Sequence, residues 1–196
     1  MSKKVLVFLA EGFEEVEAVT PIDYLRRAGI EVTVAALGKE LTVRGSHGIR
    51  VVAEAALDNL AGEGRLKPSL WDGVVVPGGL PGADNLAASK QVGDFLLGMA
   101  EAGKMIAAIC ASPARVLSPL GLLAGKKFTC YPGEEKNASL LTGAELKEDR
   151  VVIDGNFITS RGAGTAGEFA AAIIGELIGG GEAKKLADKV LMGNRG

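Results

Sequence analysis

Residues 105–113 read MIAAICASP, and they show the pattern from which the fold class is predicted. An apolar run from Met105 to Ile109 is followed at once by Cys110, two small residues and Pro113. A continuous apolar run bounded by turn-forming residues is typical of a strand that is buried on both faces of a sheet. The stretch therefore predicts a buried strand that ends on a cysteine.

The same pattern recurs along the chain, and segments of helical character separate the runs. The other apolar runs are residues 5–10, 30–36 and 73–76, and the helical segments are residues 14–28, 89–102, 164–178 and about 182–191. Strands that alternate with helices predict an α/β fold, a mostly parallel sheet with helices on both faces. Two short pairs, residues 41–44 with 49–52 and 151–154 with 157–159, predict small antiparallel hairpins at the periphery. Residues 1–196 are expected to form a single domain, because two domains of half this length would each be poorly buried.

Composition excludes several classes of partner. The chain carries 22 basic and 24 acidic side chains without long runs of one sign, which indicates neither nucleic-acid binding nor a membrane surface. The apolar run at residues 5–10 is too short for a signal peptide or a spanning helix, so a cytoplasmic protein is predicted. In a reducing compartment Cys110 and Cys130 are expected to be free thiols.

Cys110 is the strongest candidate for a chemical role. Its place at a strand end, with Ala108 and Ala111 nearby, resembles a nucleophile elbow, in which small neighbours permit a sharp turn. A helix beginning near Pro113 would favour the thiolate. The alternative is a buried core cysteine, the commoner fate of a free thiol. Its position favours the nucleophile, whereas Cys130 is expected to be structural.

Residues 76–82, VPGGLPG, follow another predicted strand. Glycines let backbone N–H groups point at a developing oxyanion, so this loop is a candidate for half of an oxyanion hole, with a plain turn as the alternative. The loop has neither the dinucleotide pattern nor a phosphate-binding pattern, and one histidine with two separated cysteines offers no typical zinc spacing. The sequence therefore predicts no metal and no organic cofactor.

Residues 11–17, EGFEEVE, place four carboxylates after the first predicted strand. Most of them are expected to be solvated acids at a helix start. On that helix Glu17 shares a face with Tyr24, while Val16 and Val19 are expected to lean toward the core. Glu17 is thus a candidate for partial burial and for acid–base chemistry.

Taken together these segments resemble the motifs of the ThiJ/PfpI superfamily, in its Parkinsonism-associated deglycase and chaperone branch. The matching segments, in the order of the family, are residues 11–17, 77–79, 108–113 and 159–165. The resemblance implies a flavodoxin-like fold, similar to class I glutamine amidotransferase domains, and a homodimer.

The resemblance also implies roles for individual residues. Cys110 would be the nucleophile and Glu17 a protonated acid beside it. The remaining site residues would be the oxyanion donors Gly79 and Ala111, Gly78 in the same loop, Tyr131, and Ala163 lining the pocket.

Two positions depart from the family pattern. Tyr131 stands where many members have a histidine, and the one histidine of this chain, His47, falls in the first predicted hairpin. Ala111 follows the cysteine where the protease-like branch has histidine. Both departures argue against a Cys–His peptidase mechanism.

The function that follows is a cofactor-independent cysteine enzyme acting on reactive carbonyls, a glyoxalase or deglycase with a stress-protective role. A thiolate would add to an aldehyde, and backbone amides would hold the resulting oxyanion. The substrate would be a small carbonyl such as methylglyoxal, or its glycated adducts. Two alternatives remain, a redox-responsive chaperone or oxidative-stress sensor and a cysteine amidase or peptidase.

Overall fold

A seven-stranded sheet forms the centre of the computed structural model, which describes residues 2–193. Its strands are β1 (Lys4–Leu9), β2 (Glu31–Ala36), β5 (Ala55–Ala56), β6 (Gly73–Val76), β7 (Met105–Ile109), β10 (Val151–Asp154) and β11 (Phe157–Ser160). They lie in the order β10-β11-β7-β6-β1-β2-β5, and every neighbouring pair is parallel except β10 with β11. The predicted α/β class with a mostly parallel sheet is confirmed.

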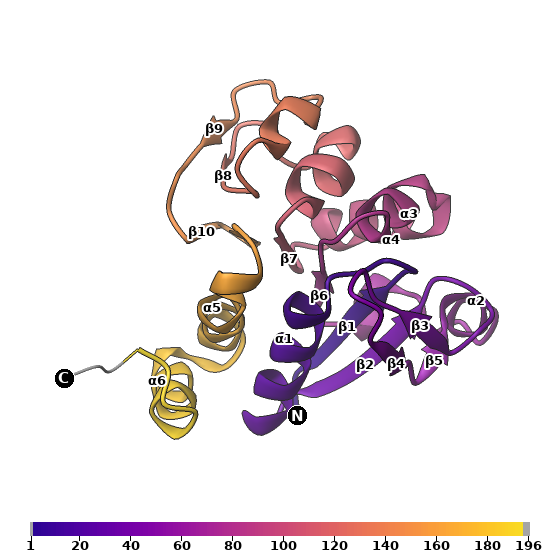
Figure 1. The fold of residues 1–196 in the computed structure, drawn as a ribbon, viewed down its shortest axis with the longest axis horizontal. Helices are drawn as coiled ribbons and strands as arrows, with labels where there is room; N and C mark the ends of the chain where they lie inside the picture. The colour runs from indigo at the N-terminus through magenta and orange to yellow at the C-terminus, as the bar shows by residue number, and fades with distance from the viewer. Residues whose placement is uncertain (1, 194–196) are drawn as a thin grey trace.

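Helices cover both faces of this sheet. The longer ones are α1 (Glu15–Arg27), α4 (Lys90–Glu101), α5 (Ala166–Ile178) and α6 (Gly180–Lys189), and the shorter ones are α2 (Leu57–Gly62) and α3 (Gly82–Ala88). Figure 1 shows α1, α5 and α6 gathered on one side, with α3 and α4 on another part of the molecule. The described helices include none with the length and apolar character needed to cross a membrane.

Alternate residues of β1 explain why both faces are covered. Val5, Val7 and Leu9 pack in the cluster under α1 and α5, whereas Leu6 and Phe8 pack in the cluster under α2, α3 and α4. All five side chains are at most 1% exposed. Because successive strand residues point to opposite faces, a strand that is apolar at every position needs two helical layers.

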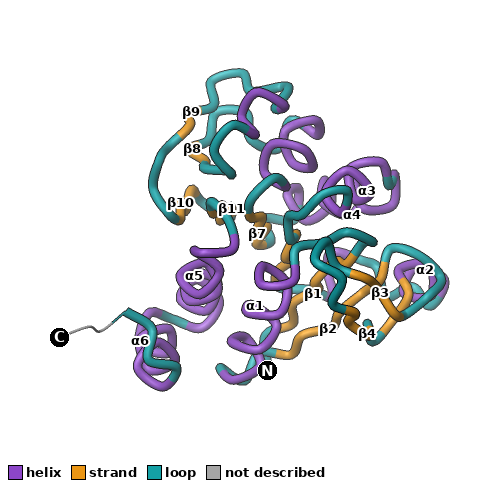
Figure 2. Tube along the Cα trace, viewed as in Figure 1, coloured by secondary structure: helices purple, strands orange, loops and turns teal. Residues whose placement is uncertain are grey.

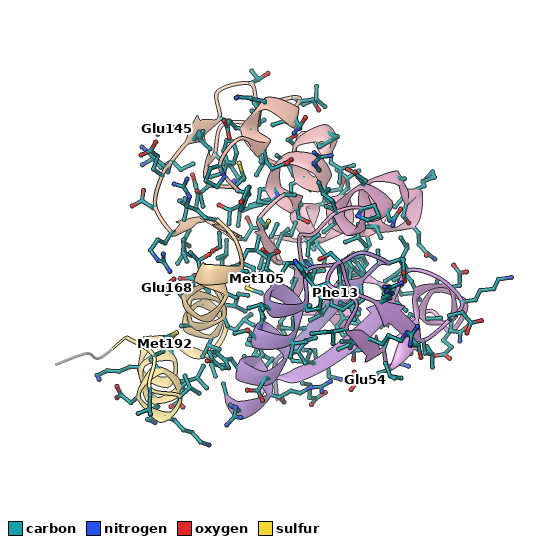
Figure 3. All side chains as sticks on the ribbon, in the orientation of Figure 1. Phe13, Glu54, Met105, Glu145, Glu168 and Met192 are labelled. Carbon is teal, nitrogen blue, oxygen red and sulfur yellow. The ribbon has the colours of Figure 1, made fainter. Side chains whose placement is uncertain are left out.

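Short elements complete the chain (Figure 2). They are the antiparallel pair β3 (Thr42–Arg44) and β4 (Arg50–Val52), the parallel pair β8 (Lys127–Phe128) and β9 (Glu145–Leu146), 3-10 turns at Pro68–Leu70, Ser118–Leu120, Glu134–Asn137 and Ala163–Thr165, and a π-helical turn at Pro113–Leu117. In Figure 3 the labelled Phe13 lies in the interior and Glu145 at the periphery, as burial of one and exposure of the other require.

The hairpin predicted at residues 151–159 is not peripheral. β11 lies inside the main sheet and pairs in parallel with β7, where Ser160 is the partner of Ile109. β10 alone forms the edge. The pairing of β11 with β7 brings Ser160 and the turn after it beside Cys110, which a peripheral hairpin would not do.

The face assigned to α1 also needs correction. Val16 and Val19 do not lean toward the core, because they are 47% and 44% exposed, while Glu15 and Glu17 are 4% and 1% exposed. The expectation that most acids at the helix start are solvated is therefore wrong for Glu15, whereas the burial of Glu17 agrees with the enclosure expected for it. The start of α1 is covered by loops rather than by the sheet, and those loops offer N–H donors to carboxylates.

Glu15 fastens the hairpin of β3 and β4 to α1. Its Oε1 accepts the backbone N–H groups of His47 at 2.8 Å and Ile49 at 3.2 Å, and its Oε2 lies 3.0 Å from Nδ1 of His47. Burial opposes ionisation of Glu15, yet the hydrogen bonds from His47 and Ile49 hold its pKa below the usual range. The carboxylate therefore acts as the anchor of an otherwise exposed turn.

Glu15→Ala is expected to lower the free energy of unfolding by about 2–3 kcal/mol at neutral pH, because the backbone N–H groups of His47 and Ile49 lose a charged, buried acceptor. The depressed pKa means that this stabilisation is present above the ordinary carboxyl range and is lost as the pH falls through the pKa of folded Glu15. Urea titrations at neutral and acid pH measure the difference. Glu31→Ala, which removes an exposed partner of Lys4 at 3.7 Å, is the control and should cost less than about 1 kcal/mol. Equal losses in the two variants would show that the hairpin is held by something else.

Candidate functional site

Cys110 occupies a strained turn at the carboxyl end of β7. Its φ is 64°, in the left-handed region that residues with a side chain seldom adopt. Two hydrogen bonds fix the peptide groups on either side of it: Cys110 N–H donates to the carbonyl of Ser160 at 2.9 Å, and Tyr131 N–H donates to the carbonyl of Cys110 at 2.9 Å. A turn held in this way directs the half-buried thiol out of the sheet.

The segment after Cys110 differs from the expected helix. A π-helical turn at Pro113–Leu117 and a 3-10 turn follow, so no long helix contributes an aligned dipole to the thiol. Ser112 instead ties this segment to the glycine loop, because its Oγ donates to the carbonyl of Pro77 at 2.6 Å. Individual N–H groups, rather than a helix terminus, must stabilise charge on the sulfur.

Gly78 lies between the thiol of Cys110 and the carboxyl of Glu17. Its N–H donates to Oε2 of Glu17 at 3.0 Å. A Cβ atom on this residue would lie 2.6 Å from both Cys110 Cβ and Oε2 of Glu17, closer than real contacts allow. Gly78 therefore uses its N–H to hold Glu17, and only glycine lets the thiol and the carboxyl approach across it.

Two other N–H groups point at the sulfur. Gly79 has a φ of 86°, and the N–H groups of Gly79 and Ala111 are the contacts that favour a negative charge on Cys110 by lowering its pKa. These are the two donors that the sequence suggested for an oxyanion. They come from the ends of adjacent parallel strands, β6 and β7, which explains how segments more than 30 residues apart meet.

Glu17 is almost completely buried, with 1% of its surface exposed. Burial raises its pKa to about 7, although hydrogen bonds with Cys110, Gly78 and Ala163 oppose the rise. The carboxyl group therefore carries its proton in much of the protein at neutral pH. Ala163, expected to line the pocket, contributes its backbone N–H to Glu17.

The thiol and the carboxyl are one coupled pair. Burial raises the pKa of Cys110 well above its usual range, and an ionised Glu17 raises it further because two negative charges would lie side by side. A protonated Glu17 has the opposite effect, since it donates a hydrogen bond to the sulfur. The pair is thus suited to hold one negative charge and one proton between them.

Tyr131 stands at the rim of this site. Its side chain is 53% exposed, and a Cβ atom on Gly162 would lie 3.2 Å from Cδ2 of its ring and 3.8 Å from Oε1 of Glu17. Cys130, the residue before it, is 3% exposed, and burial together with Glu135 and Glu134 raises its pKa to about 11. The thiol of Cys110 is therefore the more accessible of the two, and that of Cys130 is buried.

One group of side chains has the composition of a metal site, but its carboxylate oxygens already accept hydrogen bonds from the protein. Ligand atoms of Glu14, Glu15 and His47 lie within 4.8 Å of one another. Glu15 accepts the N–H groups of the hairpin turn, and Glu14 accepts the N–H of Glu17 at 2.7 Å as the cap of α1. These bonds assign the group a structural role.

Known proteins are similar to this chain over nearly its whole length. Residues 3–176 match the model of the DJ-1/PfpI family. Protein DJ-1 homolog B of Arabidopsis thaliana is 43% identical over 96% of this chain, and protein dj-1beta of Drosophila melanogaster is 41% identical over 98% of both chains. The chain spans less than half the length of the two Arabidopsis relatives, at 41% and 46%. A Caenorhabditis elegans relative named glutathione-independent glyoxalase DJR-1.2 is 36% identical over 90% of both chains.

Solved structures agree with this similarity. The crystal structure of Drosophila melanogaster DJ-1beta has a TM-score of 0.89 and 42% identity, and covers 99% of this chain and 100% of that one. A structure of oxidized Toxoplasma gondii DJ-1 has a TM-score of 0.89 and 38% identity, with 98% and 100% covered. The fold and the superfamily that the sequence motifs predicted are confirmed.

Gly78→Ala is expected to abolish the preferential reactivity of Cys110, because the new methyl group needs space that the thiol and Glu17 occupy. The rate of alkylation of Cys110, located by peptide mass spectrometry, measures the effect. Gly62→Ala is the control, since nothing lies within 4 Å of a Cβ atom there, and it should leave the rate unchanged. A normal alkylation rate in folded Gly78→Ala would contradict the close approach described above.

The titration of Cys110 should depend on the hydrogen bond that residue 17 can offer. Glu17→Leu removes the donor and is expected to move the thiolate titration to higher pH than in the wild type, while Glu17→Gln, which still donates, should move it less. Thiolate absorbance against pH measures this, with Cys130→Ala present in every variant so that the absorbance reports on Cys110 alone. A downward shift in Glu17→Leu would mean that Glu17 is ionised beside the sulfur, and three superimposable curves would remove it from the mechanism.

Proposed function

The chain belongs to the DJ-1/PfpI family, and from this premise we propose that it is a cofactor-independent cysteine enzyme that acts on reactive carbonyls, of the glyoxalase or deglycase type. The observation that carries the proposal is the pairing of Cys110, in its strained turn, with a buried Glu17 whose pKa lies near 7. A group that titrates near neutral pH beside a nucleophile is suited to move protons during the reaction.

The first step is addition to an aldehyde. The Cys110 thiolate attacks the aldehyde carbon of methylglyoxal, a C–S bond forms, and the π electron pair of the carbonyl moves to oxygen. The N–H groups of Gly79 and Ala111 stabilise that oxyanion, and Glu17 supplies the proton that makes it a hydroxyl. The product is a hemithioacetal, with the negative charge now on Glu17.

The second step is an internal proton transfer. Ionised Glu17 takes the proton from the carbon that bears the sulfur, and the C–H electron pair moves through the new C–C double bond of an enediolate onto the ketone oxygen. The hydroxyl proton passes to that oxygen, Glu17 returns its own proton to the neighbouring carbon, and the former aldehyde carbon becomes a thioester. Water then adds to the thioester carbonyl, and the C–S bond breaks to release lactate and the thiolate. The aldehyde is oxidised and the ketone reduced within one molecule, so no external oxidant or cofactor takes part.

A deglycase reaction shares the first step. An early adduct of methylglyoxal on an amine or thiol first loses that group: the C–N or C–S bond breaks, its electron pair leaves with the amine or thiol, and the hydroxyl proton of the adduct passes to the leaving group as the carbonyl re-forms. The Cys110 thiolate then adds to this carbonyl as above. The name of the Caenorhabditis elegans relative supports the glyoxalase form for this chain. A stress-protective role in the cytoplasm follows from removal of a toxic carbonyl and belongs to the same proposal.

An oxidative-stress sensor with chaperone activity is the second candidate. Accessible thiols with a stabilised thiolate are the ones that oxidise, and Cys110 is half buried whereas Cys130 is 3% exposed. A relative has been solved in an oxidized form. The amidase or peptidase alternative has less support, because Tyr131 and Ala111 occupy the positions at which a histidine base would be expected.

We also propose that the working form is a homodimer of single-domain chains. Apolar side chains on α1 and on the hairpin fastened to it are exposed, among them Val16, Val19, Ile49 and Val52 at 44% to 69%. Neighbouring exposed apolar groups of this kind mark surfaces that associate.

Wild-type protein should convert methylglyoxal to lactate without glutathione, and Cys110→Ala should reduce the rate to that of buffer. Glu17→Gln should retain thiol reactivity but lose roughly 10²–10⁴-fold in turnover, because proton transfer is removed. Cys130→Ala is the matched control and should remain active.

A panel of methylglyoxal, glycated peptides and simple peptides separates the glyoxalase, deglycase and peptidase activities. Suppression of client aggregation without any turnover would favour the chaperone.

A further inference from the structure

Arg115 is a charged residue beside the site to which the proposed chemistry gives no role. It lies in the π-helical turn that follows Cys110, and its side chain is 23% exposed. Its Nε donates to Oε2 of Glu134 at 2.6 Å and its Nη2 to Oε1 of the same carboxylate at 3.3 Å. Its Nη1 donates to Oδ1 of Asp84 at 2.9 Å. One guanidinium thus joins segments that lie 19 and 31 residues away along the chain.

Both of these segments border Cys110. Asp84 belongs to α3, which begins shortly after Gly79, one of the N–H donors to the sulfur. Glu134 begins the 3-10 turn after Tyr131 and donates its N–H to the Tyr131 carbonyl at 3.0 Å. The ion pair between Arg115 and Glu134 therefore fastens the Tyr131 segment to the turn that carries the thiol.

The Tyr131 ring depends on that fastening for its place. The ring stands close to Gly162 and to the Oε1 side of Glu17, and 53% of the Tyr131 side chain is exposed. A ring that is enclosed on so few sides is positioned mainly by its backbone, which Tyr131 N–H and Glu134 N–H attach to the neighbouring segments. If the Tyr131 segment moved away from the turn that carries Cys110, the ring would move away from the entrance to the site.

Arg115 and Glu134 form a stronger clamp than an ordinary surface pair. Their side chains are 23% and 16% exposed, and the guanidinium uses two N–H groups on one carboxylate. Bidentate pairs have a fixed geometry, which a lysine cannot reproduce. Asn137 adds a further hydrogen bond to Oε2 of Glu134 at 3.1 Å.

We propose that Arg115 is a positioning residue that holds the Tyr131 ring at the mouth of the site and so limits the size of the molecule that reaches Sγ of Cys110. The inference rests on the proposed function in that it takes Cys110 as the reacting group. It adds a substrate class: a small free dicarbonyl passes the ring, whereas the same carbonyl carried as an adduct on a bulky molecule is hindered.

The test compares a small and a bulky thiol reagent. For each variant the second-order rate of Cys110 alkylation is measured with iodoacetamide, the small reagent, and with N-(1-pyrenyl)maleimide, the bulky one. The size ratio is the first rate divided by the second, and peptide mass spectrometry locates the label at Cys110. The ratio is expected to fall roughly tenfold in Arg115→Met, because the bulky reagent gains access, and to fall less in Arg115→Lys. Arg65→Met is the matched control, since it removes an exposed arginine–glutamate pair, and its ratio should equal that of the wild type.

A double-mutant cycle connects the effect to the ring. Tyr131→Ala should lower the size ratio by itself, and Arg115→Met added to it should produce little further change. Independent, additive effects would overturn the inference, as would a wild-type ratio in folded Arg115→Met. If Arg115→Met does not fold, Glu134→Gln takes its place, with the same expected fall and the same contrary result.

The outcome is separable from the fate of the proposed function. Alkylation needs no turnover, so the size ratio reports on the clamp even if the wild type releases no lactate from methylglyoxal. Where turnover is present, Arg115→Met should raise the rate on glycated peptide relative to methylglyoxal. An unchanged preference between these substrates, together with an unchanged alkylation ratio, would contradict the assigned role.

Discussion

Gly78 connects the loop after β6 to the start of α1 through both of its peptide groups. Its N–H donates to Glu17 at 3.0 Å, and its carbonyl accepts the N–H of Glu14 at 3.0 Å. The absence of a side chain at this position leaves room for Cys110 and Glu17 to meet. The rest of the site depends on this contact, because without it the carboxyl would lose its fixed place beside the thiol and the thiol would face solvent alone.

The half-buried thiol of Cys110 and the buried carboxyl of Glu17 impose an electrostatic constraint on each other. Two negative charges in an enclosed space are unfavourable, so a single charge shared with a single proton is the state that the surroundings support. The N–H groups of Gly79 and Ala111 serve whichever group carries that charge, first the thiolate and then an oxyanion. The proposed enzyme and the proposed sensor use the same property, since both need a stabilised sulfur anion that remains accessible.

The first turns of α1 distribute three carboxylates among three tasks. Glu14 caps the helix, Glu15 holds the β3–β4 hairpin, and Glu17 faces the thiol. Successive residues of a helix point about 100° apart, so neighbours in sequence reach different surroundings. Val16, between these acids, and Val19, after them, remain exposed and are available for contact with another chain.

Much of the fold was predictable from the sequence, because it follows from local patterns. Buried strands at Gly73–Val76 and Met105–Ile109 were predicted to the residue, since continuous apolar runs bounded by turn residues have few other interpretations. The place of Cys110 at a strand end followed from the same pattern. Glu17 was singled out by its helix face and by the family resemblance. The three-dimensional contacts were needed to find that Glu15 is buried as well, that β11 enters the main sheet, and that Arg115 joins α3 to the Tyr131 segment. Periodicity specifies which residues share a face of a helix or strand, but the loops that cover that face come from distant parts of the chain, and burial, charge and pKa depend on those loops.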